Sequence, residues 1–333
     1  VVEAATNLLS RNRRRIPKTV AAASKAAAGI EVVRAAEKDM GRQLVAVTRE
    51  LIEADGPESV AILARVNVGL LVPQIAFSEA EIPAEAPLDG SLLDRSGVRS
   101  ALAWLRLGAA VARQEPLSGA DLDEATRRPA RGLSPGVRSA LGRGMWKFSR
   151  LASFAAGAND DRTRTRLGGL VDDLAALGRL AETESVSTQL LHIRDQLGLG
   201  DALDRLDDSR ARPTGGHTDD LDALIVLAHA HPEVEAFEPW LRSSLDVRPA
   251  AGPNVTLTTV HRAKGAEWPH VVVWDASVGL MPHRLADDME EERRIFHVAI
   301  TRCSRSVTVL ARAKRPSPFL AELLSEDAQR STA

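Results

Sequence analysis

The 333-residue sequence has one cysteine, Cys303, no tyrosine and only six phenylalanines. A single cysteine excludes an internal disulfide and a thiolate metal cluster, which fits a reducing compartment. No apolar run approaches the roughly 20 residues that a membrane helix needs, and no signal peptide is recognisable. We therefore expect a cytoplasmic chain without membrane association, whose five tryptophans are the main candidates for base stacking.

The sequence also lacks a large excess of positive or negative charge, because the formal net charge is −2. The kind of basic residue is more informative: 37 of the 43 are arginine and six are lysine. Arginine offers a planar fork of donors that suits phosphates, although a coding bias toward arginine and alanine explains the same excess. Arg11–Lys18 concentrates five basic residues in eight positions, which is typical of a solvated loop or of a phosphate contact.

A phosphate-binding loop is absent as well, since G-x-x-x-x-G-K-[ST] occurs nowhere in the sequence. Val271–Asp275 resembles an apolar strand ending in a magnesium-binding aspartate, but without that loop we favour a core strand with a capping aspartate. His261, His270 and His283 lack metal-ligand spacing. We predict no metal site in this chain.

The hydrophobic pattern predicts an α/β domain interrupted by a helical insertion. Short β-branched runs alternate with amphipathic helices over residues 1–91 and return over 251–333, whereas 92–250 reads as helical with almost no strand. The strands are expected at 29–33, 59–66, 255–260, 271–275 and 306–311. The helices are expected at 1–9, 41–54, 69–77, 98–107, 167–180, 187–197, 221–229, 290–302 and 316–324.

The first segment that could carry chemistry is VTLTTVHRAKGAEWPHVVV, Val255–Val273. A strand leads into a polar turn, and turns at the carboxyl ends of parallel strands are where α/β sheets bind ligands. Gly265 would let the backbone approach a ligand closely, and Glu267 could accept hydrogen bonds from hydroxyls. An ordinary polar turn is the alternative interpretation.

The second segment is EEERRIFHVAITRCSR, Glu290–Arg305. Helical spacing places Arg302 at the end of the apolar stripe formed by Ile295, Val298 and Ala299. An arginine there needs an anionic partner, because burying an unpaired charge is costly. That partner is either a nearby glutamate or a nucleotide phosphate.

Together these segments resemble two motifs of the superfamily 1 helicases of the UvrD/PcrA/Rep type. TTVHRAKGAEWPHVVV is similar to motif V and EEERRIFHVAITR to motif VI, and GLMPHR lies between them at the family's spacing. Weaker likeness covers SVAILARVN (Ser59–Asn67), the entry to the insertion (Glu81–Leu107), RRPARGLSP (Arg127–Pro135) and RPSPFLAEL (Arg315–Leu323).

The resemblance implies a RecA-like motor domain with a parallel sheet, interrupted by an all-α inserted subdomain. It implies that Arg302 reaches the γ-phosphate of ATP from across a cleft, and that Gly265 and Glu267 border the nucleotide. It also implies that Thr259 and His261 face single-stranded DNA and that the segment with Arg131 and Gly132 grips duplex DNA at the junction. Movement would be 3′-to-5′, in DNA repair or recombination.

Several features depart from the family pattern. Leu133 and Ser134 follow Gly132 where the family has a Gly-Ile-Gly turn, and Ala266 and Trp268 flank Glu267 in place of leucine and phenylalanine. Val1 falls inside a helical pattern, so we expect the second part of a longer protein. Its N-terminal motor domain would then be the partner that holds most of the ATP and Mg²⁺. The alternative is a free-standing DNA-binding or regulatory protein without ATPase activity.

Overall fold

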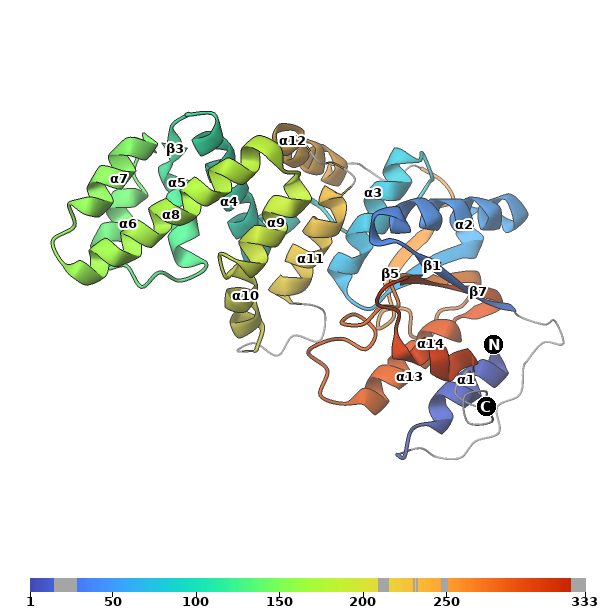
Figure 1. The fold of residues 1–333 in the computed structure, drawn as a ribbon. Helices are drawn as coiled ribbons and strands as arrows, with labels where there is room; N and C mark the ends of the chain where they lie inside the picture. The colour runs from blue at the N-terminus through green and yellow to red at the C-terminus, as the bar shows by residue number, and fades with distance from the viewer. Residues whose placement is uncertain (15–28, 209–215, 230, 232, 247–250, 325–333) are drawn as a thin grey trace. The chain divides into compact units, whose positions relative to one another are not determined.

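The computed structural model describes residues 1–14, 29–208, 216–229, 231, 233–246 and 251–324. The chain forms two compact units, drawn in Figure 1. Unit 1 combines Val1–Asp89 with Val247–Ala333, and unit 2 is the intervening Gly90–Asp246. The predicted organisation, an α/β fold interrupted by a helical insertion, is present.

Unit 1 contains a five-stranded sheet in the order β1-β7-β6-β2-β5, and every pairing in it is parallel. The strands are β1 (Gly29–Ala35), β2 (Val60–Ala64), β5 (Thr256–Thr259), β6 (Trp268–Val273) and β7 (Cys303–Arg312). The central strand, β6, follows the insertion in the sequence, whereas its neighbour β2 precedes it. The sheet therefore joins the two separated stretches of sequence into one unit.

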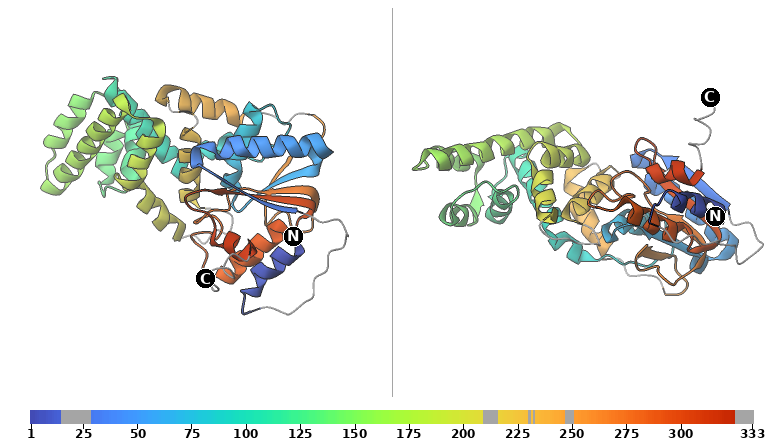
Figure 2. Two further views of the ribbon diagram at one scale, coloured as in Figure 1. Left: turned by 45° about the vertical axis from the view of Figure 1, so that its right-hand side comes forward. Right: turned by 90° about the horizontal axis from the view of Figure 1, so that it is seen from below.

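Helices cover both faces of this sheet, as Figures 1 and 2 show. The helices of unit 1 are α1 (Val2–Ser10), α2 (Met40–Asp55), α3 (Leu71–Glu79), α13 (Met289–Ile300) and α14 (Pro318–Leu324). Its 3₁₀ turns are η1 (Glu37–Asp39), η2 (Pro57–Ser59) and η3 (Asn67–Leu70). Alternate side chains of β2 show why two layers form: Ala61 and Leu63 pack with α13 and α14, whereas Ile62 packs with α2.

Local sequence explains where α13 begins. The carboxylate of Asp288 accepts hydrogen bonds from the backbone N–H groups of Glu290 (2.9 Å) and Glu291 (3.3 Å), as an N-cap does. The glutamates of the first turn favour the positive end of the helix dipole. The helix ends at Ile300, so the predicted helix to Arg302 was two residues too long, and Arg302 lies between α13 and β7.

Among the described residues of unit 2, the regular structure is helical except for one short antiparallel pair, β3 (Leu117–Ser118) with β4 (Met145–Trp146). Its longest helix, α8, packs against α4 at two glycines. A Cβ on Gly108 would lie 2.6 Å from Leu177 Cγ, and one on Gly178 would lie 2.5 Å from Val111 Cγ1. The helices are α4 (Ser96–Ala112), α5 (Gly119–Arg127), α6 (Pro135–Leu141), α7 (Phe148–Ala156), α8 (Asp161–Thr183), α9 (Val186–Asp195), α10 (Leu199–Asp208), α11 (His217–Ala228) and α12 (Val234–Leu245), with the 3₁₀ turn η4 (Gly90–Asp94) at its start.

Two further expectations concern ions and membranes. Within the described ranges, no group of three or more His, Cys, Asp or Glu side chains is arranged to hold a metal ion. Asp275, the aspartate after β6, is buried and forms an ion pair with Arg312 at 2.7 Å. Among the described helices, none has both the length and the apolar character to span a bilayer.

Candidate functional site

The polar turn between β5 and β6 is tightly folded. The carbonyl of Thr259 accepts hydrogen bonds from the N–H groups of Arg262 and Ala263, both at 3.0 Å. Gly265 follows with a φ of +88° and nothing within 4 Å of where its Cβ would lie. This left-handed conformation favours glycine, and the open space on that side leaves the backbone accessible to a ligand.

Arg302 lies against the end of this turn. Its Nε donates to the carbonyl of Val298 at 3.2 Å, and its Nη1 lies 3.4 Å from the carbonyl of Ala266. Its own carbonyl accepts from the N–H of Trp268 at 2.9 Å. The structure therefore brings Arg302 together with the segment that carries Gly265 and Glu267.

The contacts of the Arg302 guanidinium group bear on the two partners considered from the sequence, a glutamate and a nucleotide phosphate. Within the described residues, no carboxylate forms an ion pair with its guanidinium group; the contacts are with neutral carbonyl oxygens. Glu267 is exposed and forms no hydrogen bond or ion pair with any described residue. A half-buried cation held only by carbonyls can accept an anionic ligand, such as a phosphate oxygen.

The pKa values of two neighbouring groups, His297 and Cys303, are shifted by burial and by the charges of this site. Burial lowers the pKa of His297, and the positive charge of Arg302 lowers it further. Burial raises the pKa of the Cys303 thiol, and the charge of Glu267 adds to that rise. Both groups are therefore favoured in their neutral forms.

The residues predicted to face single-stranded DNA lie at the other end of the same turn. Thr259 is buried at the end of β5, where its carbonyl shapes the turn, whereas His261 is exposed. Burial of part of the ring and the positive charge of Arg65 lower the pKa of His261. Of the two residues, only His261 presents a side chain that DNA could reach.

Arg65 belongs to a buried ion pair that the sequence did not reveal. Its guanidinium donates to both oxygens of Glu292, with the shortest contact at 2.7 Å, and the side chains are only 10% and 3% exposed. The N–H of His283 also donates to Glu292 at 2.8 Å. The three residues come from the end of β2, the loop before α13 and α13 itself.

The predicted basic run Arg11–Lys18 is described only as far as Arg14; residues 15–18 lie outside the described ranges. The N–H groups of Arg13 (2.8 Å) and Arg14 (3.1 Å) donate to the carboxylate of Glu290, and the side chain of Arg14 pairs with Asp288. The described part of this run therefore packs on the beginning of α13.

The two residues predicted to contact duplex DNA lie in unit 2 and differ in exposure. The Arg131 side chain is 12% exposed, pairs with Asp173 and lies over the ring of Trp104. Gly132 is exposed with a φ of +63°, and its carbonyl accepts a hydrogen bond from Arg166. The Arg166 guanidinium group also lies 2.9 Å from where a Cβ on Gly132 would be, so Arg131 and Gly132 both have partners within unit 2.

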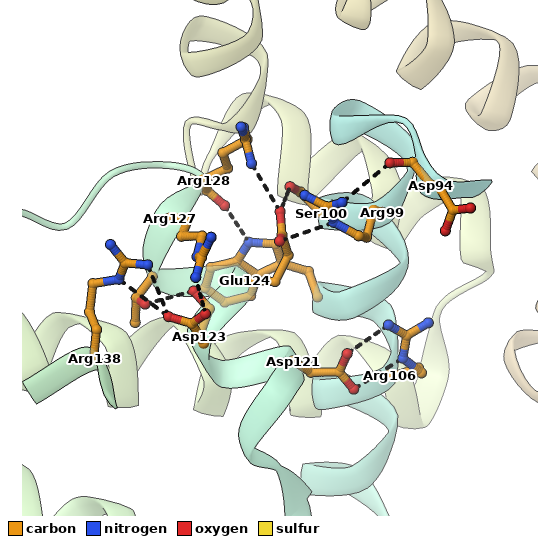
Figure 3. Close-up of polar contacts among 12 residues, drawn as sticks. Asp94, Arg99, Ser100, Arg106, Asp121, Asp123, Glu124, Arg127, Arg128 and Arg138 are labelled. Atoms are coloured by element: carbon orange, nitrogen blue, oxygen red, sulfur yellow. Dashed lines mark hydrogen bonds and ion pairs between the residues drawn. The ribbon is translucent and has the colours of Figure 1, made fainter. Parts of the chain in front are cut away.

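Beside Gly132 lies a cavity of about 380 Å³ that we call the arginine pocket. Figure 3 shows its guanidinium groups arranged around two carboxylates, Asp123 and Glu124. Four arginines against two carboxylates leave a net charge of +2. The arginines are Arg99, Arg127, Arg128 and Arg138. Only the arginine-rich segment RRPAR pointed to this pocket in the sequence.

Comparison with known proteins shows which proteins this chain is similar to. A family model described as the UvrD-like helicase C-terminal domain matches residues 236–312, a range that includes the turn, α13 and Arg302. The ATP-dependent DNA helicase PcrA of Staphylococcus epidermidis is 25% identical over 97% of this chain and 48% of its own length. The chain thus spans about half the length of this relative.

Two other relatives have a higher identity to this chain, but over shorter stretches. The ATP-dependent DNA helicase Rep of Salmonella typhimurium is 37% identical over 87 residues, which is 22% of this chain and 13% of Rep. PcrA of Staphylococcus aureus is 41% identical over 86 residues, 21% of this chain and 12% of the relative. Residues 236–312 thus match the UvrD-like helicase C-terminal domain, and the chain as a whole is similar to part of the DNA helicases PcrA and Rep.

Proposed function

We propose that this chain supplies the arginine-bearing half of an ATP-dependent DNA helicase or translocase. The observation that carries the proposal is the guanidinium group of Arg302, held by the carbonyls of Val298 and Ala266 without a carboxylate partner among the described residues. When ATP is bound by a second motor domain, Arg302 would contact its γ-phosphate and stabilise the charge that develops during hydrolysis.

The remaining residues of this site have supporting roles in the proposal. Gly265 lets the turn approach the nucleotide, and the exposed carboxylate of Glu267 accepts hydrogen bonds from the ribose hydroxyls. Mg²⁺ would be bound mainly by the second domain, which would also hold most of the ATP. ATP then favours one arrangement of the two motor domains and ADP another, which moves the chain 3′-to-5′ along one strand.

The DNA contacts divide between the units. His261 and the turn that begins at Thr259 contact single-stranded DNA in unit 1. In unit 2, Gly132 and the arginine pocket contact phosphates of the duplex at the junction, where a net positive pocket suits the DNA backbone. The process served is DNA unwinding in repair or recombination.

Salt dependence tests the DNA part of this proposal on the chain itself. For single-stranded DNA, the logarithm of the affinity falls with the logarithm of the salt concentration with a slope of about −0.7 per phosphate contact. Three or four such contacts predict that the affinity for a thymidine oligonucleotide falls roughly 20- to 50-fold between 50 and 200 mM salt. Fluorescence anisotropy of a labelled oligonucleotide measures this loss.

Two histidine variants give that measurement its control. His261→Ala should weaken binding, whereas His229→Ala, an exposed histidine of unit 2 whose ring contacts the carbonyl of Ile225, should not. An affinity that does not change with salt would contradict the proposed DNA contacts.

A further inference from the structure

The buried ion pair between Arg65 and Glu292 lies between the two candidate sites of unit 1. Arg65 directly follows β2, and Ala64 of β2 pairs with Thr259 of β5. The N–H of Val260 donates to the carbonyl of Ala64 at 3.0 Å. Arg65 and His261 therefore leave neighbouring parallel strands at the same edge of the sheet, at the start of the turn proposed to contact DNA.

Glu292 has all of its contacts inside the unit. Two nitrogens of Arg65 and the N–H of His283 donate to its carboxylate, and the residue is 4% exposed. The carboxylate therefore holds the end of β2, the loop before α13 and the first turns of α13 in one arrangement. Any movement of Arg65 must be followed by Glu292 or must break this pair.

The far end of α13 reaches the nucleotide side of the unit. Glu292 lies eight positions before Ile300, the last residue of α13, which corresponds to about 12 Å along a helix, and Arg302 follows two positions later. The N–H of Thr301 donates to the carbonyl of His297 at 3.1 Å, and Arg302 bonds back to Val298. Because a helix with its hydrogen bonds intact moves as a rigid body, displacement of its first turn displaces Arg302.

We infer that Glu292 is a positioning residue, which transmits the presence of DNA beside Arg65 and His261 along α13 to Arg302. The inference rests on the proposed function, because it assumes that single-stranded DNA binds at this turn. A phosphate of the DNA near Arg65 competes with Glu292 for the guanidinium group, and the first turn of α13 then shifts relative to β2. Coupling of this kind requires one element whose position both sites influence, and α13 is that element.

Hydrogen exchange of the 333-residue chain tests the inference, with a thymidine oligonucleotide of about 16 nucleotides as the probe. In the unsubstituted chain, the oligonucleotide should change exchange at residues 258–263, where it binds, and at residues 298–303, where it does not. Glu292→Gln keeps an acceptor for the N–H of His283 but removes the negative charge. Its affinity for the oligonucleotide should stay within about threefold of that of the unsubstituted chain. The change at 258–263 should persist, and the change at 298–303 should fall below about a third of its original size.

Glu291→Gln is the matched control. Its carboxylate is 58% exposed and pairs with Arg294 on the surface, so both exchange changes should remain. If Glu292→Gln loses protection in β7, Arg65→Lys is measured instead, since lysine keeps the charge but not the two-pronged contact. The inference would be overturned if the folded variant showed the full DNA-induced change in hydrogen exchange at residues 298–303. It would also be overturned if the unsubstituted chain bound DNA without any such change. Absence of DNA binding by the unsubstituted chain would instead refute the proposed function.

Discussion

Arg302→Ala should lower ATP hydrolysis by on the order of 10³-fold or more when this chain is combined with a motor domain that carries a phosphate-binding loop. The reason is the position of the guanidinium group. It lies beside the Gly265–Glu267 turn and has no carboxylate partner among the described residues. Removing it takes away positive charge where the γ-phosphate would develop negative charge. Steady-state hydrolysis with saturating single-stranded DNA measures the loss.

DNA binding should survive this substitution, because Arg302 follows the C-terminal end of α13, whereas His261, the residue proposed to contact DNA, follows β5. Arg302→Lys should recover only part of the activity, since an ammonium group cannot form two parallel hydrogen bonds with a phosphate. Arg305→Ala is the control: Arg305 is three residues away, 59% exposed and paired with Asp55. Loss of DNA binding with hydrolysis intact would reverse the role assigned to Arg302.

The second large effect concerns stability. Glu292→Ala should lower the free energy of unfolding of unit 1 by about 3–5 kcal/mol, because it leaves a buried arginine without its partner. Arg65 is 10% exposed, so water cannot replace the lost carboxylate. Glu291→Ala, on the exposed side of the same turn, should change that free energy by less than about 0.5 kcal/mol.

Hydrogen exchange of the slowest amides in β6 and β7 measures this difference within unit 1 alone. A urea titration of the whole chain would mix the unfolding of the two units. Equal losses of stability in the two variants would show that the Arg65–Glu292 pair contributes no more than a surface pair.

Much of the fold of unit 1 was predictable because the sequence patterns that indicate its strands and helices are local. β-branched runs mark the strands, and the apolar stripes of α2 and α13 repeat at helical spacing. The turn with Gly265 and Glu267 and the arginine Arg302 were proposed as site residues from the sequence. They lie near one another because β6 and β7 are parallel neighbours, with Trp268 opposite Cys303.

What the sequence did not reveal depends on distant partners. Of the consecutive glutamates Glu291 and Glu292, the first is exposed and the second is buried, where it pairs with Arg65, 227 residues away in the sequence. Arg131 suited a phosphate contact by its place in an arginine-rich segment, but its side chain pairs with Asp173, 42 residues further along the chain. Pattern and propensity carry no information on such pairings.

ATP hydrolysis by the purified chain alone, with and without single-stranded DNA, tests the central claim most directly. The account predicts no hydrolysis above the buffer rate, because this sequence supplies the arginine and the turn but has no phosphate-binding loop. Adding a motor domain with such a loop should produce DNA-stimulated hydrolysis that depends on Arg302. Appreciable turnover by the chain alone would contradict the account.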